Sequence, residues 1–119
     1  MKIGVVFTVS LFGLLGCADD GGPPAPYNVT AETGGGAAAL RWSYKAAPGL
    51  DCFLIQRSER FNYDFVDLAK SPAWELYYDD GDVAVGETYY YRVAAFYKTW
   101  NDEKDVLSRF SPEVSVKIE

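Results

Sequence analysis

The chain has 119 residues, of which 49% are apolar and 16% are aromatic, and its net charge is −6. This length accommodates one domain, and the apolar fraction is high enough to form a core. The acidic balance argues against a nucleic-acid-binding protein, which needs clustered basic side chains to contact phosphates. The sequence also contains no histidine and only two cysteines. We therefore expect no zinc cluster, no cofactor and no enzymatic activity, because the usual acid–base group and the commonest metal ligand are missing.

Residues 1–16 predict a cleavable secretory signal. Lys2 precedes an apolar run over 3–15, and Gly16 and Cys17 follow that run. The run is shorter than the roughly 20 residues that cross a bilayer as a helix, which favours a signal peptide over a membrane span. An ordinary signal peptide that is cut near this point is the alternative interpretation of the same residues.

The segment Leu14-Leu15-Gly16-Cys17 resembles the lipobox of bacterial lipoproteins. The resemblance implies cleavage after Gly16, diacylglycerol on the Cys17 thiol and an acyl chain such as palmitate on the new amino group. Several acyl chains together make dissociation from the membrane negligible, so we expect a lipid-anchored protein of the cell envelope. Lipoprotein sorting in enteric-type bacteria retains proteins that have Asp directly after the cysteine. Ala18 stands there in this chain, which favours the outer membrane over the inner membrane. The pair Asp19-Asp20 resembles the acidic surface-export signals of other bacterial groups, which would place the protein on the cell surface.

Residues 17–23 are expected to form the lipidated N-terminus and a linker, and 24–119 a single domain. The stretch 19–26 is rich in Gly and Pro and holds no apolar side chain larger than Ala or Pro. Gly-Gly is flexible and Pro-Pro favours an extended backbone. We therefore expect a tether that does not pack against the domain and that keeps it close to the lipid headgroups.

Short runs of alternating apolar and polar residues, separated by turn residues, fill the rest of the chain. Seven strands in about 95 residues fit an all-β, immunoglobulin-like sandwich, and we find no helical periodicity. The predicted strands cover 27–32, 37–45, 52–58, 64–69, 75–79, 88–98 and 108–118.

Several of these strands resemble those of fibronectin type III domains. The segment 26–31 resembles the first strand, Leu40-Arg41-Trp42 the second, 53–58 the third and 108–118 the last. Gly-Glu-Thr-Tyr-Tyr-Tyr-Arg-Val at 86–93 is the most specific match, and the resemblance covers 24–119. It implies a seven-stranded fibronectin type III sandwich.

The alternation along the strands also predicts the core. Trp42 is expected at its centre, and its loss to Ala should cost about 3–5 kcal/mol. The resemblance places Tyr89 at the tyrosine corner, where its hydroxyl bonds to the chain just upstream. The surrounding core residues are Leu40, Phe53, Ile55, Tyr91, Val93, Val114 and Val116.

The opposite parity predicts the outward face of one sheet, formed by Leu54, Gln56, Tyr90, Arg92 and Phe96. Interface centres favour aromatic side chains and Arg, so Tyr90, Arg92 and Phe96 are candidate binding residues. Ordinary cross-strand pairing, with Arg92 over Tyr90, is the alternative.

Trp100 is the fourth candidate, because it lies in a predicted loop over 97–105, and long loops on rigid sandwiches often bind partners. In the alternative interpretation it folds back onto the edge of the sandwich.

Two further features have a structural and a functional interpretation. Asp79-Asp80-Gly81-Asp82 could suggest calcium, but the spacing matches no EF-hand, so an acidic turn without a metal is favoured. Cys52 is expected as a free, half-buried thiol if Cys17 carries lipid. Without the lipid, a Cys17–Cys52 disulfide is the alternative.

Two functions fit these observations. The first is a lipid-anchored module that binds a protein or carbohydrate, and the second is a structural spacer or envelope-assembly component with no specific ligand. A likeness of fold cannot decide between them, because sandwiches carry unrelated functions.

Overall fold

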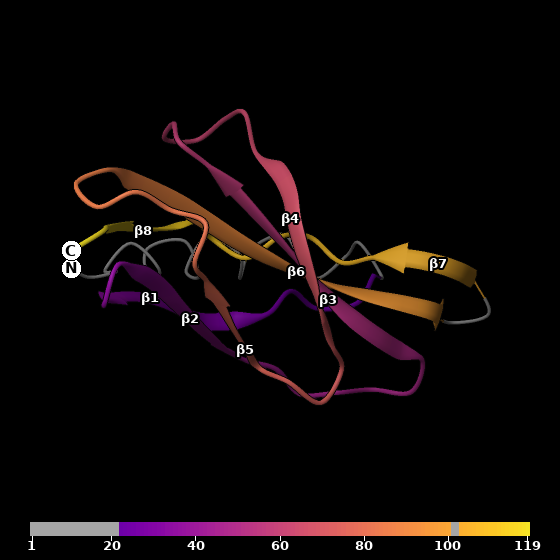
Figure 1. Cartoon of the computed structure of the whole chain (residues 1–119). Helices are drawn as coiled ribbons and strands as arrows, with labels where there is room; N and C mark the ends of the chain where they lie inside the picture. Colours follow the sequence, from indigo (N-terminus) through magenta and orange to yellow (C-terminus); the bar gives the residue numbers. More distant parts are fainter. Residues whose placement is uncertain (1–21, 101–102) are drawn as a thin grey trace.

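The computed structural model of the protein describes residues 22–100 and 103–119, with the side chains of 103 and 104 left out (Figure 1). These residues form strands and turns, with no helix among them. The strands are β1 (Tyr27–Gly34), β2 (Ala37–Ser43), β3 (Leu50–Ser58), β4 (Val66–Pro72), β5 (Tyr77–Asp80), β6 (Thr88–Trp100), β7 (Glu103–Leu107) and β8 (Val114–Lys117).

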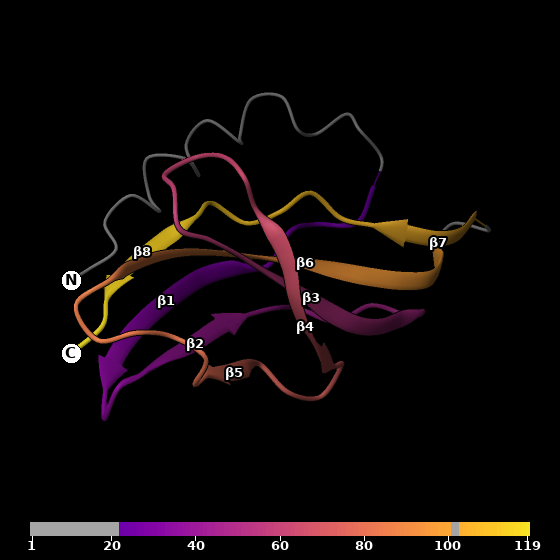
Figure 2. The same cartoon turned by 45° about the horizontal axis from the view of Figure 1, so that its top comes forward.

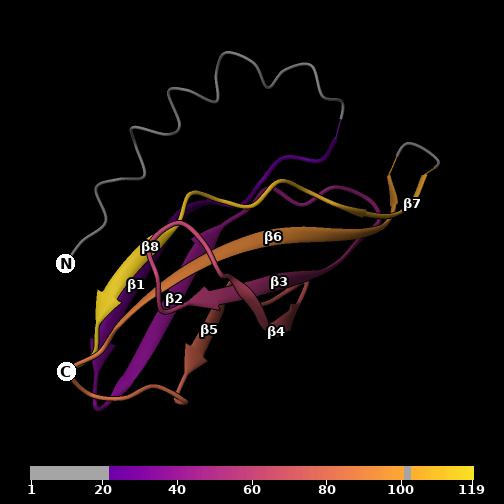
Figure 3. The same cartoon turned by 90° about the horizontal axis from the view of Figure 1, so that it is seen from above.

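The strands form two antiparallel sheets that pack face to face. One sheet has the order β1-β2-β5, and the other has the order β4-β3-β6-β7, with β8 also paired to β6. Figures 2 and 3 show the two layers from two further directions. The predicted all-β, immunoglobulin-like sandwich is confirmed.

The last predicted strand, 108–118, is shorter in the structure, where only β8 lies within it. β7 precedes it in chain order, in the stretch 103–107 that was largely predicted as a loop. β7 pairs with the second half of β6 and β8 with its first half, so the two strands follow one another along the same edge. Between them, the backbone N–H of Ser108 donates to Ala95 O and that of Ser111 to Val93 O, both at 2.8 Å. The hydroxyls of the same serines accept the backbone N–H groups of Ala95 and Val93 at 2.8 and 3.0 Å. The two hydroxyls therefore provide acceptors for backbone N–H groups of β6 where regular strand pairing is interrupted.

The predicted core residues are buried between the sheets. Trp42 makes an edge-to-face contact with Phe53, with 5.5 Å between the ring centroids. The hydroxyl of Tyr89 accepts the backbone N–H of Ala84 at 3.0 Å, which confirms the predicted bond to the upstream chain. The other predicted members, Leu40, Ile55, Tyr91, Val93, Val114 and Val116, are buried as well.

The Pro-rich segment does not behave as a tether along its whole length. Pro23 and Pro26 are buried, and the carbonyl of Pro24 accepts a hydrogen bond from the Tyr44 hydroxyl at 2.9 Å. The expectation that 19–26 makes no packing contacts is therefore wrong for its second half. Proline rings are apolar, and a polyproline segment leaves its carbonyls available to such donors.

The predicted signal and the cysteine of the lipobox, Cys17, lie outside the described residues. Within the described part of the chain, no helix is long and apolar enough to cross a membrane.

Candidate functional site

The predicted outward face exists on the larger sheet. β3 and β6 pair so that Gln56 lies opposite Arg92 and Leu54 opposite Ala94. Leu54, Gln56, Tyr90, Arg92 and Phe96 are all half-buried, because neighbouring segments cover part of this face. The predicted parity of these residues is confirmed, and the contacts of each side chain decide what the face can bind.

Arg92 is held between two phenyl rings. Its guanidinium carbon lies 4.2 Å from the ring centroid of Phe65 and 4.3 Å from that of Phe110. Its Nε donates to Gln56 Oε1 at 2.8 Å, and Gln56 Nε2 donates to Asp67 Oδ1 at the same distance. The interpretation that Arg92 lies over Tyr90 is therefore wrong, because Phe65 and Phe110 occupy both sides of the guanidinium plane.

Glu113 lies beside this arginine. Its Oε1 accepts the backbone N–H of Asn62 at 3.1 Å, whereas Oε2 is buried and has no hydrogen-bond partner among the described residues. Burial raises the pKa of Glu113, and the Asn62 N–H and the charge of Arg92 oppose that shift. Burial likewise lowers the pKa of Arg92, opposed by Glu113. The charges of Arg92 and Glu113 thus offset part of each other's loss of hydration.

Phe96 is covered by a cation at the other end of the face. Lys70 Nζ lies 5.9 Å from the centroid of the Phe96 ring. Cys52, which pairs with Phe96 in the sheet, is buried and carries a free thiol, so the half-buried position expected for it is wrong. Burial, and then the charge of Asp51, raise the pKa of the Cys52 thiol. A buried thiol with a raised pKa is a poor nucleophile.

The most exposed apolar side chains on this side of the molecule come from the loop between β3 and β4. Phe61 and Tyr63 are 65% and 56% exposed, and we call these two residues the loop surface. Val66, the first residue of β4, is also exposed, at 60%. Phe61 meets Tyr90 edge to face at 6.0 Å, so the loop surface continues onto the sheet. The sequence analysis missed it, because exposed loop residues follow no periodicity.

The loop has a defined conformation. The Ser58 hydroxyl donates to the carbonyl of Tyr63 at 2.7 Å and accepts the backbone N–H of Arg60 at 2.8 Å. Asn62 and Asp64 adopt left-handed backbone angles, with φ of 72° and 65°. Asn and Asp tolerate this conformation better than most residues. The exposed rings are therefore presented on a pinned turn.

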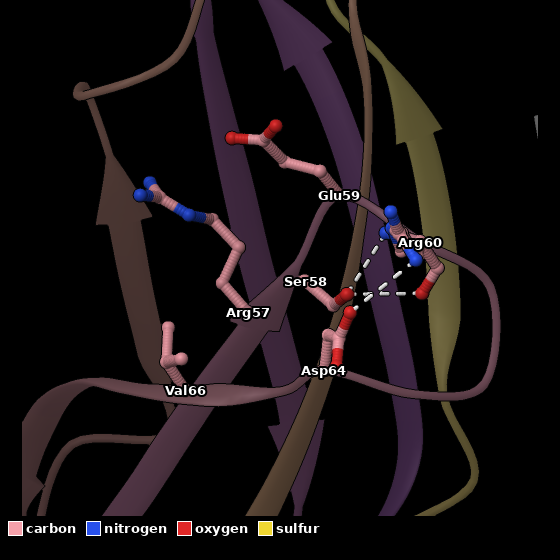
Figure 4. Close-up of a pocket in the computed structure, with 6 residues that line it drawn as sticks. All are labelled: Arg57, Ser58, Glu59, Arg60, Asp64 and Val66. Carbon is pink, nitrogen blue, oxygen red and sulfur yellow. Dashed lines mark hydrogen bonds and ion pairs between the residues drawn. The ribbon is translucent and has the colours of Figure 1, made fainter.

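A pocket of about 290 Å³ lies beside the loop surface (Figure 4). Arg57 and Arg60 lie on opposite sides of it in Figure 4, and Arg60 pairs with Asp64 at 3.6 Å. The walls thus carry both signs of charge and could hold a polar group through hydrogen bonds. The lining residues are Arg57, Ser58, Glu59, Arg60, Asp64 and Val66.

Trp100 is the last residue of β6 and does not lie in a loop. Its ring meets that of the buried Tyr97 at 4.8 Å, edge to face, and packs against the core. The predicted loop over 97–105 is wrong, because β6 continues to Trp100 and β7 begins at Glu103. The alternative, in which Trp100 folds back onto the sandwich, is confirmed.

Asp80 is also placed differently from the prediction. It lies in β5, buried, where its Oδ2 accepts from Arg57 at 2.9 Å and from the Tyr91 hydroxyl at 2.7 Å. The predicted acidic turn therefore does not include Asp80, which is the last residue of β5. Within the described residues, no three acidic or cysteine side chains are grouped to hold a metal ion.

Solved structures share this arrangement. A Fn3-like protein from Clostridium thermocellum is 28% identical, with a TM-score of 0.64, over 82% of this chain and 94% of that one. The fold is that of a fibronectin type III domain. No protein-family model and no curated protein sequence matches the chain.

Two longer chains match this one over a small part of their own length. A β-1,2-glucanase from Parabacteroides distasonis is 21% identical, with a TM-score of 0.61, over 82% of this chain but only 12% of its own length. The twitchin kinase region from C. elegans is 20% identical, with a TM-score of 0.65, over 81% of this chain and 16% of its own. Because the chain corresponds to a small part of each, these matches show the fold alone.

Proposed function

We propose that this protein is a lipid-anchored lipoprotein of the cell envelope whose fibronectin type III domain binds a protein or glycan partner. Cys17 would carry the lipid, and the outer membrane or cell surface is the favoured location. The lipobox-like segment 14–17 and the polar residues that follow it support the anchor. The acidic charge, −6 overall, argues against nucleic acid as the partner.

The loop surface is the single observation that carries the binding proposal. Single exposed apolar residues are common, but the two aromatic rings of Phe61 and Tyr63 within one pinned loop form a local patch that water solvates poorly. Phe61 extends this patch to Tyr90, and the charged pocket lies beside it. Aromatic rings next to charged and hydrogen-bonding groups suit both protein interfaces and the stacking of sugar rings.

Binding can be tested with the full-length lipidated protein, purified in detergent and used to capture partners from envelope extracts and on a glycan array. The wild type is compared with the double variant Phe61→Ser/Tyr63→Ser. We expect the wild type to retain at least one protein or glycan that the double variant loses. The matched control is Val85→Ser, which removes an exposed apolar side chain outside the loop surface and should keep all binding. Equal capture by the wild type and the double variant would remove the loop surface from the proposal.

The anchor is tested separately by mass spectrometry of protein made in a bacterium. We expect the N-terminal peptide to begin at Cys17 and to carry the added mass of the acyl chains. An unmodified Cys17 thiol, or a mature chain that begins elsewhere, would contradict the anchoring.

A spacer with no specific ligand is the second candidate, and three contacts favour it. Arg92 is enclosed by Phe65 and Phe110, Lys70 covers Phe96, and Trp100 packs on Tyr97. Three of the four side chains first considered for binding are thus engaged within the domain. The capture experiment separates the two functions, because a spacer would show no partner that depends on Phe61 and Tyr63.

A further inference from the structure

Trp74 is the most exposed large apolar side chain among the described residues, at 82%. It lies in the turn between β4 and β5, which is closed by a hydrogen bond from Glu75 N to Pro72 O at 2.9 Å. The Ser71 hydroxyl, which is buried, donates to the carbonyl of Glu75 at 3.2 Å. The turn therefore holds the indole in solvent, and Leu76 and Tyr77 beside it are exposed as well.

This turn lies at the same end of the sandwich as the beginning of the described chain. The carbonyl of Leu76 accepts the backbone N–H of Trp42 at 3.1 Å, and the carbonyl of Pro24 accepts the hydroxyl of Tyr44 at 2.9 Å. Trp42 and Tyr44 are two residues apart at the end of β2, so both segments meet that end. In Figure 2, the described chain begins at the upper right, and the turn between β4 and β5 lies at the bottom, near the middle of the molecule's length.

The chain that leads to this end is short. Five peptide units separate Cys17 from Gly22, and an extended chain spans at most about 3.5 Å for each, or about 18 Å in total. If Cys17 carries lipid, Gly22 stays within that distance of the headgroups, and the end of the domain where the described chain begins lies next to it. We call this end the anchor-proximal end. It includes the 44–49 loop, because this loop follows the end of β2. It also includes Lys98, whose backbone N–H donates to Gly49 O in that loop at 3.0 Å.

We propose that the anchor-proximal end rests on the lipid bilayer, with Trp74 at the boundary between headgroups and acyl chains. The proposal rests on the proposed lipidation of Cys17. Tryptophan favours this boundary because its ring is apolar and its N–H still finds a polar partner. Lys45 and Lys98 are exposed at the same end, where they can approach lipid phosphates.

This orientation assigns a direction to the proposed binding module. β3 leads from the anchor-proximal end to the loop that carries Phe61 and Tyr63, and β4 leads back from it. This loop lies in the left-hand half of Figure 2. The loop surface would thus face away from the membrane. An envelope partner could then reach it while Trp74 fixes the tilt of the domain.

The test uses full-length lipidated protein, with the acyl mass confirmed, in vesicles of phosphatidylcholine and phosphatidylglycerol. Tryptophan emission is compared between ordinary lipids and lipids brominated in the acyl chains, which quench indoles at that depth. The emission of Trp74 is the difference between the wild type and Trp74→Phe. We expect brominated lipids to remove about half of this emission. Trp42 and Trp100 pack in the domain and provide the residual signal in both proteins.

The matched control places a tryptophan on the loop surface, as Phe61→Trp in the Trp74→Phe background. It should show no quenching beyond Trp74→Phe alone. Equal quenching of the wild type and Trp74→Phe, or strong quenching of the control, would overturn the orientation. If the protein floats with the vesicles and Trp74 is not quenched, the anchor stands and only the orientation fails. A chain without acyl mass that does not float would refute the proposed function, and this inference with it.

Discussion

The carboxylate of Asp80 accepts a hydrogen bond from the guanidinium of Arg57 at 2.9 Å and joins the two sheets through the interior. Asp80 lies in β5 of the smaller sheet and Arg57 in β3 of the larger one. Their side chains are 1% and 17% exposed, so the pair is shielded from solvent. The Tyr91 hydroxyl donates to the same Asp80 oxygen. Removal of one partner from such a pair is strongly destabilising, because the other charge is then left buried without compensation.

Asp80→Asn should therefore lower the free energy of unfolding by about 3–5 kcal/mol, because it leaves the Arg57 charge buried without its partner. Urea denaturation followed by fluorescence measures the loss. The control is Asp82→Asn, whose carboxylate is 93% exposed and lies 3.9 Å from Arg57. It should change stability by less than about 0.5 kcal/mol. Similar losses in both variants would contradict a specific role for Asp80.

Trp42→Ala should cost about 3–5 kcal/mol of unfolding free energy, because it leaves a cavity beside Phe53 that the rigid sheets cannot close. Trp74→Ala removes a ring of the same size from an exposed turn and should change stability in detergent-free solution by less than about 0.5 kcal/mol. Thermal unfolding of both variants gives the comparison. A large loss in Trp74→Ala would mean that the exposed ring contributes to folding.

Tyr89→Phe removes the hydroxyl that accepts the Ala84 N–H. We expect a loss of about 1–2 kcal/mol, because this backbone donor is then left without a partner. The control is Tyr90→Phe, whose hydroxyl makes no hydrogen bond with the described residues. Its unfolding midpoint should match that of the wild type. An unchanged midpoint in Tyr89→Phe as well would show that water replaces the bond.

The alternation along single strands was enough to predict the core and the outward face, because a strand places successive side chains on opposite sides. The bond of Tyr89 was predicted from the resemblance to fibronectin type III domains. The alternation could not predict the partners of Arg92. Phe65 precedes β4, and Phe110 lies between β7 and β8, so their positions depend on the pairing of strands distant in sequence. The same limit applies to Asp80, whose partner Arg57 comes from the other sheet.

The alternation of apolar and polar residues also failed to predict features that depend on strand pairing and on local hydrogen bonds. Trp100 lies in a strand because β6 and β7 pair as a hairpin, although the residues around it are polar. The loop surface is held by the Ser58 hydroxyl and by the left-handed angles of Asn62 and Asp64. Such features follow from local backbone geometry and leave no periodic signal.

Arg92→Lys tests the aromatic enclosure of the guanidinium. Lysine keeps the charge but cannot stack flat between Phe65 and Phe110 or donate from Nε to Gln56, so we expect a loss of about 1–2 kcal/mol. The matched control is Arg41→Lys, because Arg41 lies over the single ring of Tyr77 at 5.2 Å in an exposed position. It should lose less than about 0.5 kcal/mol. Equal effects at both positions would show that the second ring adds nothing.

Glu113 predicts a pH dependence whose sign follows from its burial. Burial raises the pKa of this carboxyl in the folded protein above its value in the unfolded chain. The folded state therefore binds the proton more tightly. The stability that this gives is complete below the unfolded pKa and is lost as pH rises through the folded pKa. Glu113→Gln stays uncharged and keeps an oxygen to accept the Asn62 N–H, so it avoids that loss.

We therefore expect Glu113→Gln to gain stability relative to the wild type as the pH rises above about 4, by less than about 1 kcal/mol because the side chain is only partly buried. Urea denaturation at several pH values measures the difference, in which the other acidic groups cancel. The exposed Glu87→Gln is the control for the loss of one negative charge. A difference that shrinks as pH rises would mean that the attraction of Arg92 for the Glu113 carboxylate outweighs its burial.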